Sequence, residues 1–142
     1  MVRMFLPDFV ARDSGRVLNV TSTAAEASGP LQASYFASKA FAANLSNALV
    51  EELADTRITV TNFMPTATES EFAQRAGMKN SKLFQNTTSA RQVAQDGYDA
   101  MLRGDMDAYG GMGTKRWIMQ QMLKYMPKRA ALRAVRNAQE VA

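Results

Sequence analysis

The segment between residues 16 and 65 constrains the fold of this chain more than any other. It holds two short apolar runs, "RVLNVTST" (16–23) and "RITVTNFMP" (57–65), on either side of a stretch, 33–54, that contains no helix-breaking residue. Short apolar runs bounded by turn residues are typical of buried strands, and we expect the first strand at about 17–21. A strand–helix–strand order predicts a parallel βαβ unit and hence an α/β fold.

The rest of the chain extends this pattern in both directions. Residues 1–12 show the apolar spacing of an amphipathic helix. A further helix is expected over 89–104, because Ser89 is a good N-cap and Gly104 a good helix terminator. A weak third strand is expected within "DAYGGMG" (107–113). The sequence therefore predicts about three parallel strands with helices on both faces, as in a Rossmann-like, doubly wound sheet.

The composition excludes several kinds of chemistry. The chain of 142 residues has no cysteine and no histidine. Disulfides, zinc sites built on these residues, cysteine nucleophiles and Ser-His-Asp triads are therefore excluded. No apolar run is long enough to span a bilayer, and the first residues do not resemble a signal peptide, so we expect a cytoplasmic location.

One motif, "YFASK" at residues 35–39, suggests acid–base chemistry. In a helix, residues four apart share a face, so Tyr35 and Lys39 point the same way. An ammonium about 5 Å from a phenol favours the phenolate by about 3 kcal/mol at an effective dielectric near 20. The motif alone also fits a second interpretation, in which Tyr35 packs on the core and Lys39 is solvated.

The positions of other hydroxyl groups favour the first interpretation. Thr21 and Ser22 end the first strand, and the loop 24–32 is long enough to bring Tyr35 back over the same edge of the sheet. The segment "PTATES" (65–70) leaves the second strand at that edge as well. Ligands of open parallel sheets bind at the carboxyl ends of the strands. We therefore expect the hydroxyls of Ser22 and Tyr35 to face one substrate oxygen.

Three segments of the chain resemble a known family, the short-chain dehydrogenases/reductases. They are "GRVLNVTSTA", "YFASKAFAANLSNALVEEL" and "ITVTNFMPTATESEF", and the similarity extends over essentially the whole chain. Ser22, Tyr35 and Lys39 fall on the family's catalytic residues. The resemblance implies hydride transfer between a nicotinamide and a carbonyl or alcohol carbon. In that reaction Tyr35 would move the proton, Ser22 would bind the substrate oxygen, and Lys39 would hold the nicotinamide ribose.

The resemblance also implies a cofactor site and a small carbonyl or alcohol substrate. The cofactor would be NADP or NAD, with NADP slightly favoured, held by Tyr35, Lys39, Pro65, Thr66 and Thr68. One of these residues departs from the family, which usually has glycine where this chain has Thr66. Glycine permits a close backbone approach that threonine resists. The resemblance further implies a substrate lid over about 70–85.

A second departure concerns the phosphate site. The family's glycine-rich turn is absent, and the clustered glycines at 110, 111 and 113 come too late in the chain to replace it. We therefore expect a C-terminal half, with a catalytic part at 1–113, a basic helical tail at 114–142 and the N-terminal dinucleotide-binding half missing. The first strand would then have an unpaired inner edge. The alternative is a non-catalytic remnant, or an oligomerisation or interaction module.

The tail carries most of the excess positive charge. It has seven cations against one acid, Glu140, and divides into two helical segments at Pro127. We expect its helices to dock by their apolar side and to leave a solvated basic face. Binding of nucleic acid is not expected, and binding of an acidic membrane surface is the weaker alternative. The resemblance implies a homo-oligomer formed through the helix that begins near Ala33.

Overall fold

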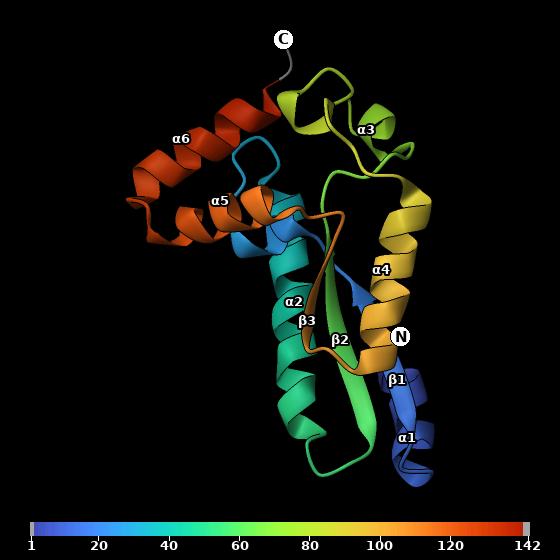
Figure 1. Ribbon diagram of the computed structural model, residues 1–142. Coiled ribbons are helices and arrows are strands. Elements are labelled where there is room, and N and C mark those ends of the chain that lie inside the picture. Colours follow the sequence, from blue (N-terminus) through green and yellow to red (C-terminus); the bar gives the residue numbers. More distant parts are fainter. Residues whose placement is uncertain (1, 141–142) are drawn as a thin grey trace.

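The computed structural model describes residues 2–140. Along the chain, the elements alternate between helices and parallel strands (Figure 1). They are α1 (Val2–Ala11), β1 (Gly15–Val20), the short 3-10 helix η1 (Thr23–Glu26), α2 (Ala33–Glu52), β2 (Ile58–Pro65), α3 (Phe72–Arg75), the 3-10 helix η2 (Lys82–Phe84), α4 (Ala90–Arg103), β3 (Asp107–Gly110), α5 (Thr114–Tyr125) and α6 (Lys128–Gln139).

The strands form one parallel sheet in the order β1-β2-β3. β1 pairs with β2 in a register that sets Gly15 opposite Ile58 and Val20 opposite Phe63. β3 pairs with the carboxyl-terminal half of β2, ending with Gly110 opposite Pro65. The parallel α/β sheet predicted from the sequence is therefore confirmed. β1 begins two residues earlier than expected and ends one residue earlier, at Val20.

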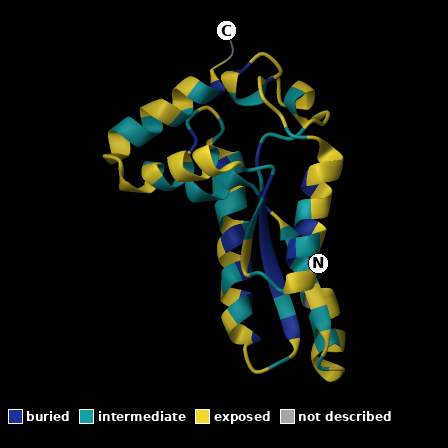
Figure 2. Cartoon of the chain, in the orientation of Figure 1, coloured by how far each residue is buried: buried dark blue, intermediate teal, exposed yellow. Residues whose placement is uncertain are grey.

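Helices cover both faces of the sheet, because alternate residues of β2 point in opposite directions. On one face, Ile58 and Val60 form a core with Leu49 and Leu53 of α2, and the apolar residues of α1 pack against the same cluster. On the other face, Phe63 lies against Gly97 of α4. Figure 2 shows the consequence, with β2 the most deeply buried element. The doubly wound arrangement is therefore present.

The ends of α4 follow the predicted capping chemistry. The side chain of Ser89 accepts a hydrogen bond from the backbone N–H of Gln92. At the other end Gly104 adopts a left-handed conformation, with φ of 77°, that suits glycine better than any other residue. The predicted start and stop of this helix are both confirmed.

Most of the remaining elements lie around the carboxyl ends of the strands. In Figure 1, η1, the N-terminal end of α2, the α3 region and the two C-terminal helices all lie at this end of the sheet. α2 packs against η1, and α6 packs against η2. Parallel strands concentrate their following loops at one edge, so a ligand site is expected there. Within residues 2–140, no helix combines the length and the apolar character that crossing a bilayer requires.

The tail forms two helices separated at Pro127, as expected, but they pack differently from the expectation. α6 docks, with Gln139 buried and only 4% exposed. α5 instead leaves large apolar side chains in solvent. These are Trp117, Ile118, Met119, Met122 and Tyr125. The expectation that α5 docks by its apolar side is therefore wrong. The side chains with which α5 contacts the rest of the chain are largely polar ones, including Gln120 and Lys124.

The packing of Phe63 predicts the effect of a methyl group at Gly97. A Cβ atom at Gly97 would lie 2.8 Å from the ring of Phe63, which is 2% exposed and has little room to move. Such overpacking typically costs 1–3 kcal/mol and exceeds the gain of about 1 kcal/mol in helix propensity. We expect Gly97→Ala to lower the free energy of unfolding, measured by urea denaturation, by roughly 1 kcal/mol.

Gly113→Ala is the matched control for that measurement. A Cβ atom at Gly113 meets nothing within 4 Å, so its effect is confined to the change of N-cap residue in α5. That change costs about 1 kcal/mol or less. An unchanged or increased stability in Gly97→Ala would show that the ring of Phe63 can move aside, contrary to the packing described.

Candidate active site

The carboxyl edge of the sheet is fixed by a line of buried hydrogen bonds. The hydroxyl of Thr21, which is 2% exposed, lies 2.7 Å from Oδ1 of Asn62 and 3.0 Å from the carbonyl oxygen of Phe63. The side-chain amide of Asn62 donates to Oδ1 of Asp107 at 2.6 Å. These contacts link the carboxyl end of β1 to β2 and to the first residue of β3, so the residue that follows Thr21 has a defined position.

Ser22 follows immediately and begins η1 as its N-cap. Its Oγ accepts a hydrogen bond from the backbone N–H of Ala24 at 3.1 Å. An N-cap hydroxyl that accepts through oxygen keeps its proton available for another acceptor. The hydroxyl proton of Ser22 therefore remains available at the end of β1.

α2 is held on β1 at two points. The side-chain amide of Asn19 donates to Oγ of Ser46 at 2.9 Å, and Ser46 is completely buried. Near the start of the helix, Nζ of Lys39 donates to the carbonyl oxygen of Val20 at 3.3 Å. Because both contacts join α2 to β1, the first turns of α2 are fixed beside the carboxyl end of that strand.

Lys39 and Tyr35 share a face of α2, as their spacing predicts. Nζ of Lys39 lies 5.8 Å from the centroid of the Tyr35 ring. Partial burial lowers the pKa of the Lys39 ammonium, because removal of water disfavours the charged form. The lysine therefore lies next to the last residue of β1, two residues before Ser22, with the ring of Tyr35 beside it.

Aromatic residues of the segment 70–85 cover the other side of Tyr35. Its ring centroid lies 5.5 Å from that of Phe72, which in turn lies 6.0 Å from that of Phe84. These spacings are typical of favourable aromatic pairs. The segment predicted as a substrate lid thus packs on Tyr35 through Phe72 of α3, and Phe84 of η2 packs on Phe72 in turn.

Thr66 uses its side chain within the protein. Its hydroxyl lies 3.2 Å from the carbonyl oxygen of Gly110 and 3.1 Å from that of Gly111, and its backbone N–H also donates to Gly110. The threonine that replaces the family's glycine therefore ties the end of β2 to the end of β3. The hydroxyl of Thr68 donates to the carbonyl oxygen of Thr66 at 2.9 Å.

These contacts divide the five residues predicted to bind a cofactor into two groups. Lys39 places its ammonium at the carboxyl end of β1, and the ring of Tyr35 lies beside that ammonium. Pro65, Thr66 and Thr68 lie at the end of β2, and the hydroxyl protons of the two threonines are engaged in the protein's own hydrogen bonds. The second group therefore presents its backbone and its hydroxyl lone pairs, and not its hydroxyl protons, to the surroundings.

A second polar cluster nearby was not predicted from the sequence. The Tyr109 hydroxyl donates to Oε1 of Glu26 at 2.9 Å, and Nζ of Lys124 donates to the same oxygen at 2.6 Å. Burial, together with the hydrogen bond to Glu26, raises the pKa of Tyr109 to about 12. The partners of Glu26 are 83 and 98 residues away in the sequence, so no local pattern indicates the cluster. It joins η1 to β3 and α5.

A model of one protein family matches more than half of the sequence. The family is described as "short chain dehydrogenase", and the match covers residues 1–81. The chain belongs to the short-chain dehydrogenase family.

Curated relatives agree with this assignment. A 2,3-dihydroxy-2,3-dihydro-p-cumate dehydrogenase of Pseudomonas putida is 34% identical over 83 residues, which are 58% of this chain and 32% of that protein. Nodulation protein G of Rhizobium meliloti is 34% identical over 79 residues, 56% of this chain and 32% of that protein. The matched region thus spans about a third of the length of these relatives.

Solved structures of the family share the fold. A short-chain dehydrogenase from Burkholderia cenocepacia in complex with NADP superposes with a TM-score of 0.73 at 26% identity, covering 94% of this chain and 53% of that one. A 7β-hydroxysteroid dehydrogenase superposes with a TM-score of 0.75 at 17% identity, covering 94% and 52%. The chain therefore has the fold of about half of such an enzyme.

The position of Tyr109 predicts a pH dependence of stability. The unfolded chain loses this phenolic proton near pH 10.0, whereas the folded chain keeps it until about pH 12. This contribution to stability is therefore complete below pH 10 and is lost as the pH rises from 10 to 12. We expect Tyr109→Phe to remove that part of the decline, measured by urea unfolding at a series of pH values.

Tyr125→Phe serves as the control, because Tyr125 is 89% exposed. Between pH 10 and 12, the free energy of unfolding of the control variant should fall as much as that of the unsubstituted protein. If Tyr109→Phe also showed the full decline between pH 10 and 12, the raised pKa of Tyr109 would be contradicted.

Proposed function

We propose that this protein is an NAD(P)-dependent oxidoreductase, or the catalytic half of one, that acts on a small carbonyl or alcohol. The observation that carries the proposal is the position of Lys39, whose Nζ binds the last carbonyl of β1 and lies beside the ring of Tyr35. The structurally similar Burkholderia enzyme, which was solved with NADP, supports NADP as the cofactor.

Tyr35 is the proposed general acid and base. The ammonium of Lys39 lies next to the Tyr35 ring, and a nearby cation stabilises negative charge that develops during proton transfer. In reduction, the Tyr35 hydroxyl gives its proton to the oxygen of the carbonyl and becomes a phenolate; in oxidation, the phenolate takes the proton back from the alcohol. Proton transfer by a positioned group of this kind contributes about 10²- to 10⁴-fold to the rate.

Ser22 is the proposed donor to the same substrate oxygen. Charge develops on that oxygen as the carbonyl is reduced, and a preorganised donor stabilises it. The N–H of Ala24 fixes the position of Oγ before the substrate arrives. The two donors, Ser22 and Tyr35, therefore act without a further rearrangement of the strand end.

Lys39 and Tyr35 are the residues proposed to hold the nicotinamide cofactor, with the backbone after Pro65 completing the site from the end of β2. A bound nicotinamide would supply or accept the hydride, since no protein side chain does so. Partial burial of Lys39 strengthens its interaction with polar groups of a ligand, because it reduces screening by water.

A second function, as an oligomerisation or interaction module, is favoured by the outer surface of α2. Phe41 is 71% exposed and Leu45 is 43% exposed, and residues four apart share one face of a helix. Exposed apolar side chains that adjoin on a surface are typical of protein interfaces. We propose that α2 packs against α2 of a second copy of the chain. This pairing does not depend on whether the protein is catalytically active.

Substitution of Tyr35 tests the proposed reaction. Tyr35→Phe keeps the ring that packs on Phe72 and removes the acid. We expect kcat for NADPH-dependent reduction of a panel of small ketones and aldehydes to fall by about 10²- to 10⁴-fold. NADPH binding, measured by fluorescence titration, should weaken far less than kcat falls, because Lys39 and the backbone after Pro65 still hold the cofactor.

The matched control is Tyr125→Phe, which makes the same chemical change at an 89% exposed position and should leave kcat unchanged. Full activity in Tyr35→Phe would refute the role of the phenol. If the unsubstituted protein shows no saturable NADPH binding, the interaction module becomes the better description of the chain.

Substitution of Phe41 tests the proposed pairing of α2. We expect Phe41→Glu to shift the protein toward the monomer in sedimentation velocity, because the carboxylate would be desolvated in the contact. Glu51→Gln, an exposed change further along α2, should leave the assembly as it is. An oligomer unaffected by Phe41→Glu would place the interface elsewhere.

A further inference from the structure

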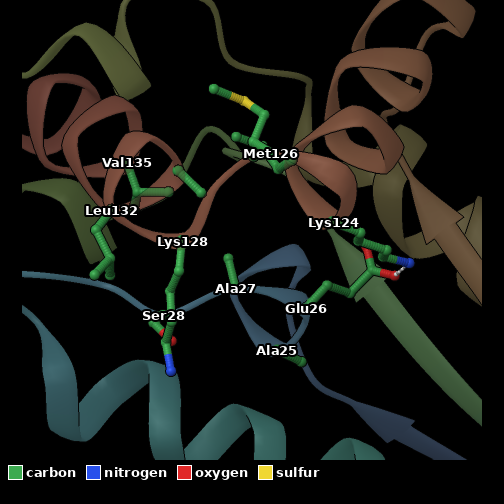
Figure 3. A pocket seen from close by; sticks show the side chains of 11 residues that line it. Ala25, Glu26, Ala27, Ser28, Lys124, Met126, Lys128, Leu132 and Val135 are labelled. Carbon is green, nitrogen blue, oxygen red and sulfur yellow. Dashed lines mark hydrogen bonds and ion pairs between the residues drawn. The ribbon is translucent and has the colours of Figure 1, made fainter.

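A cavity lies between η1 and the two C-terminal helices. Its volume is about 460 Å³, within the range of about 300–1,000 Å³ that is usual for small-molecule sites. It is lined by Ala25, Glu26, Ala27 and Ser28 on one side and by Leu123, Lys124, Met126, Lys128, Ala131, Leu132 and Val135 on the other. Figure 3 shows these side chains converging from the two sides.

Most of the lining is aliphatic. Leu123 of α5 and Leu132 and Val135 of α6 are each half-buried and border the cavity together with Met126. On the opposite side, Ala25 and Ala27 expose only methyl groups and backbone. A ligand with an alkyl chain would bury apolar surface against this lining, which is favourable at about 25 cal/mol for each Å².

The charged side chains that line the cavity, Glu26, Lys124 and Lys128, carry a net positive charge. The carboxylate of Glu26 is neutralised by the Lys124 ammonium at 2.6 Å. Lys128 reaches across from α6 toward Ser28 (Figure 3), and among the described residues no carboxylate pairs with it. Lys128 is exposed, so water satisfies its ammonium in the free protein, and a carboxylate bound in the cavity would accept hydrogen bonds from it instead.

The residues around the cavity add to this positive charge. The segment 114–142, which forms one wall, has seven cations and one acid. Like charges concentrated on one side of a cleft raise the local concentration of the opposite charge. The field around the cavity therefore attracts anions and repels cations.

We propose that this cavity is a binding site for an aliphatic carboxylate. The alkyl chain lies along Leu132, Val135 and Met126, and the carboxylate accepts hydrogen bonds from the ammonium of Lys128. An ammonium acts as a point charge with three donors and binds a carboxylate without demanding one geometry.

The site adjoins the proposed active site through η1. Ser22 caps η1, and Ala25 and Glu26, in the same short helix, border the cavity. Binding of the carboxylate does not require the proposed reaction. An experiment can therefore refute the binding site without refuting the proposed function, and the reverse. Where both hold, a carbonyl compound with a carboxylate-terminated alkyl chain is a substrate class that fits the protein.

Calorimetric titration of the full chain with octanoate tests the site directly and requires no turnover. We expect one saturable site for octanoate, with octanol and octylammonium as probes of the same length that bind at least about fivefold more weakly, which is the magnitude of one exposed ion pair. Lys128→Gln should weaken octanoate by about fivefold and leave octanol unchanged.

Two variants complete the design. Lys79→Gln removes the same charge at an exposed position in the lid segment and should bind octanoate as the unsubstituted protein does. Leu132→Gln should weaken both octanoate and octanol, because both use the alkyl lining. Equal binding of octanoate and octanol, unchanged octanoate binding in Lys128→Gln, or no octanoate binding at all would overturn the proposal.

Discussion

The buried hydrogen-bond line through Thr21, Asn62 and Asp107 is the constraint on which the rest of the site depends. It runs from the residue after β1, through Asn62 inside β2, to Asp107 at the start of β3, and the side chains of Thr21 and Asn62 are almost inaccessible to solvent. Buried polar groups are costly when unpaired, so a strand that shifted by one residue would lose both partners and expose its apolar face. The line therefore fixes where β1 ends and where Ser22 begins.

The position of α2 follows from that fixed edge. Asn19 and Ser46 hold the middle of the helix on β1, and Lys39 binds the strand's last carbonyl oxygen. Since Tyr35 lies one turn before Lys39, its ring is set by the same anchor, and Phe72 packs on the side that the anchor leaves open. The two residues of α2 proposed to act in the reaction thus lie in the same first two turns that Lys39 holds on β1.

Much of this could be predicted from the sequence, because the relevant signals are local. The apolar run at 16–23, the unbroken helix beginning near Ala33 and the caps at Ser89 and Gly104 each depend on neighbouring residues, and the structure confirms them. The short helix η1 was expected only as a loop, since its cap forms through the backbone of Ala24.

The contacts that could not be predicted join distant segments. Glu26 meets Tyr109 and Lys124 across 83 and 98 residues, and neither spacing has a periodic signature. Thr66 departed from the family pattern in sequence, and only the fold shows that its hydroxyl binds carbonyls of the β3 end. The exposed apolar face of α5 was missed for a related reason, because an amphipathic pattern does not reveal whether a neighbour is present.

The central claim is that the hydroxyl of Ser22 and the phenol of Tyr35 can reach one substrate oxygen beside the ammonium of Lys39. A crystal structure of the protein with a ketone analogue would measure the separation of Ser22 Oγ and Tyr35 Oη directly. The account predicts a separation of about 6 Å or less, since each donor must lie roughly 2.6–3.2 Å from the shared oxygen. Two hydroxyls on opposite sides of the strand end, with no atom of the ligand between them, would contradict it.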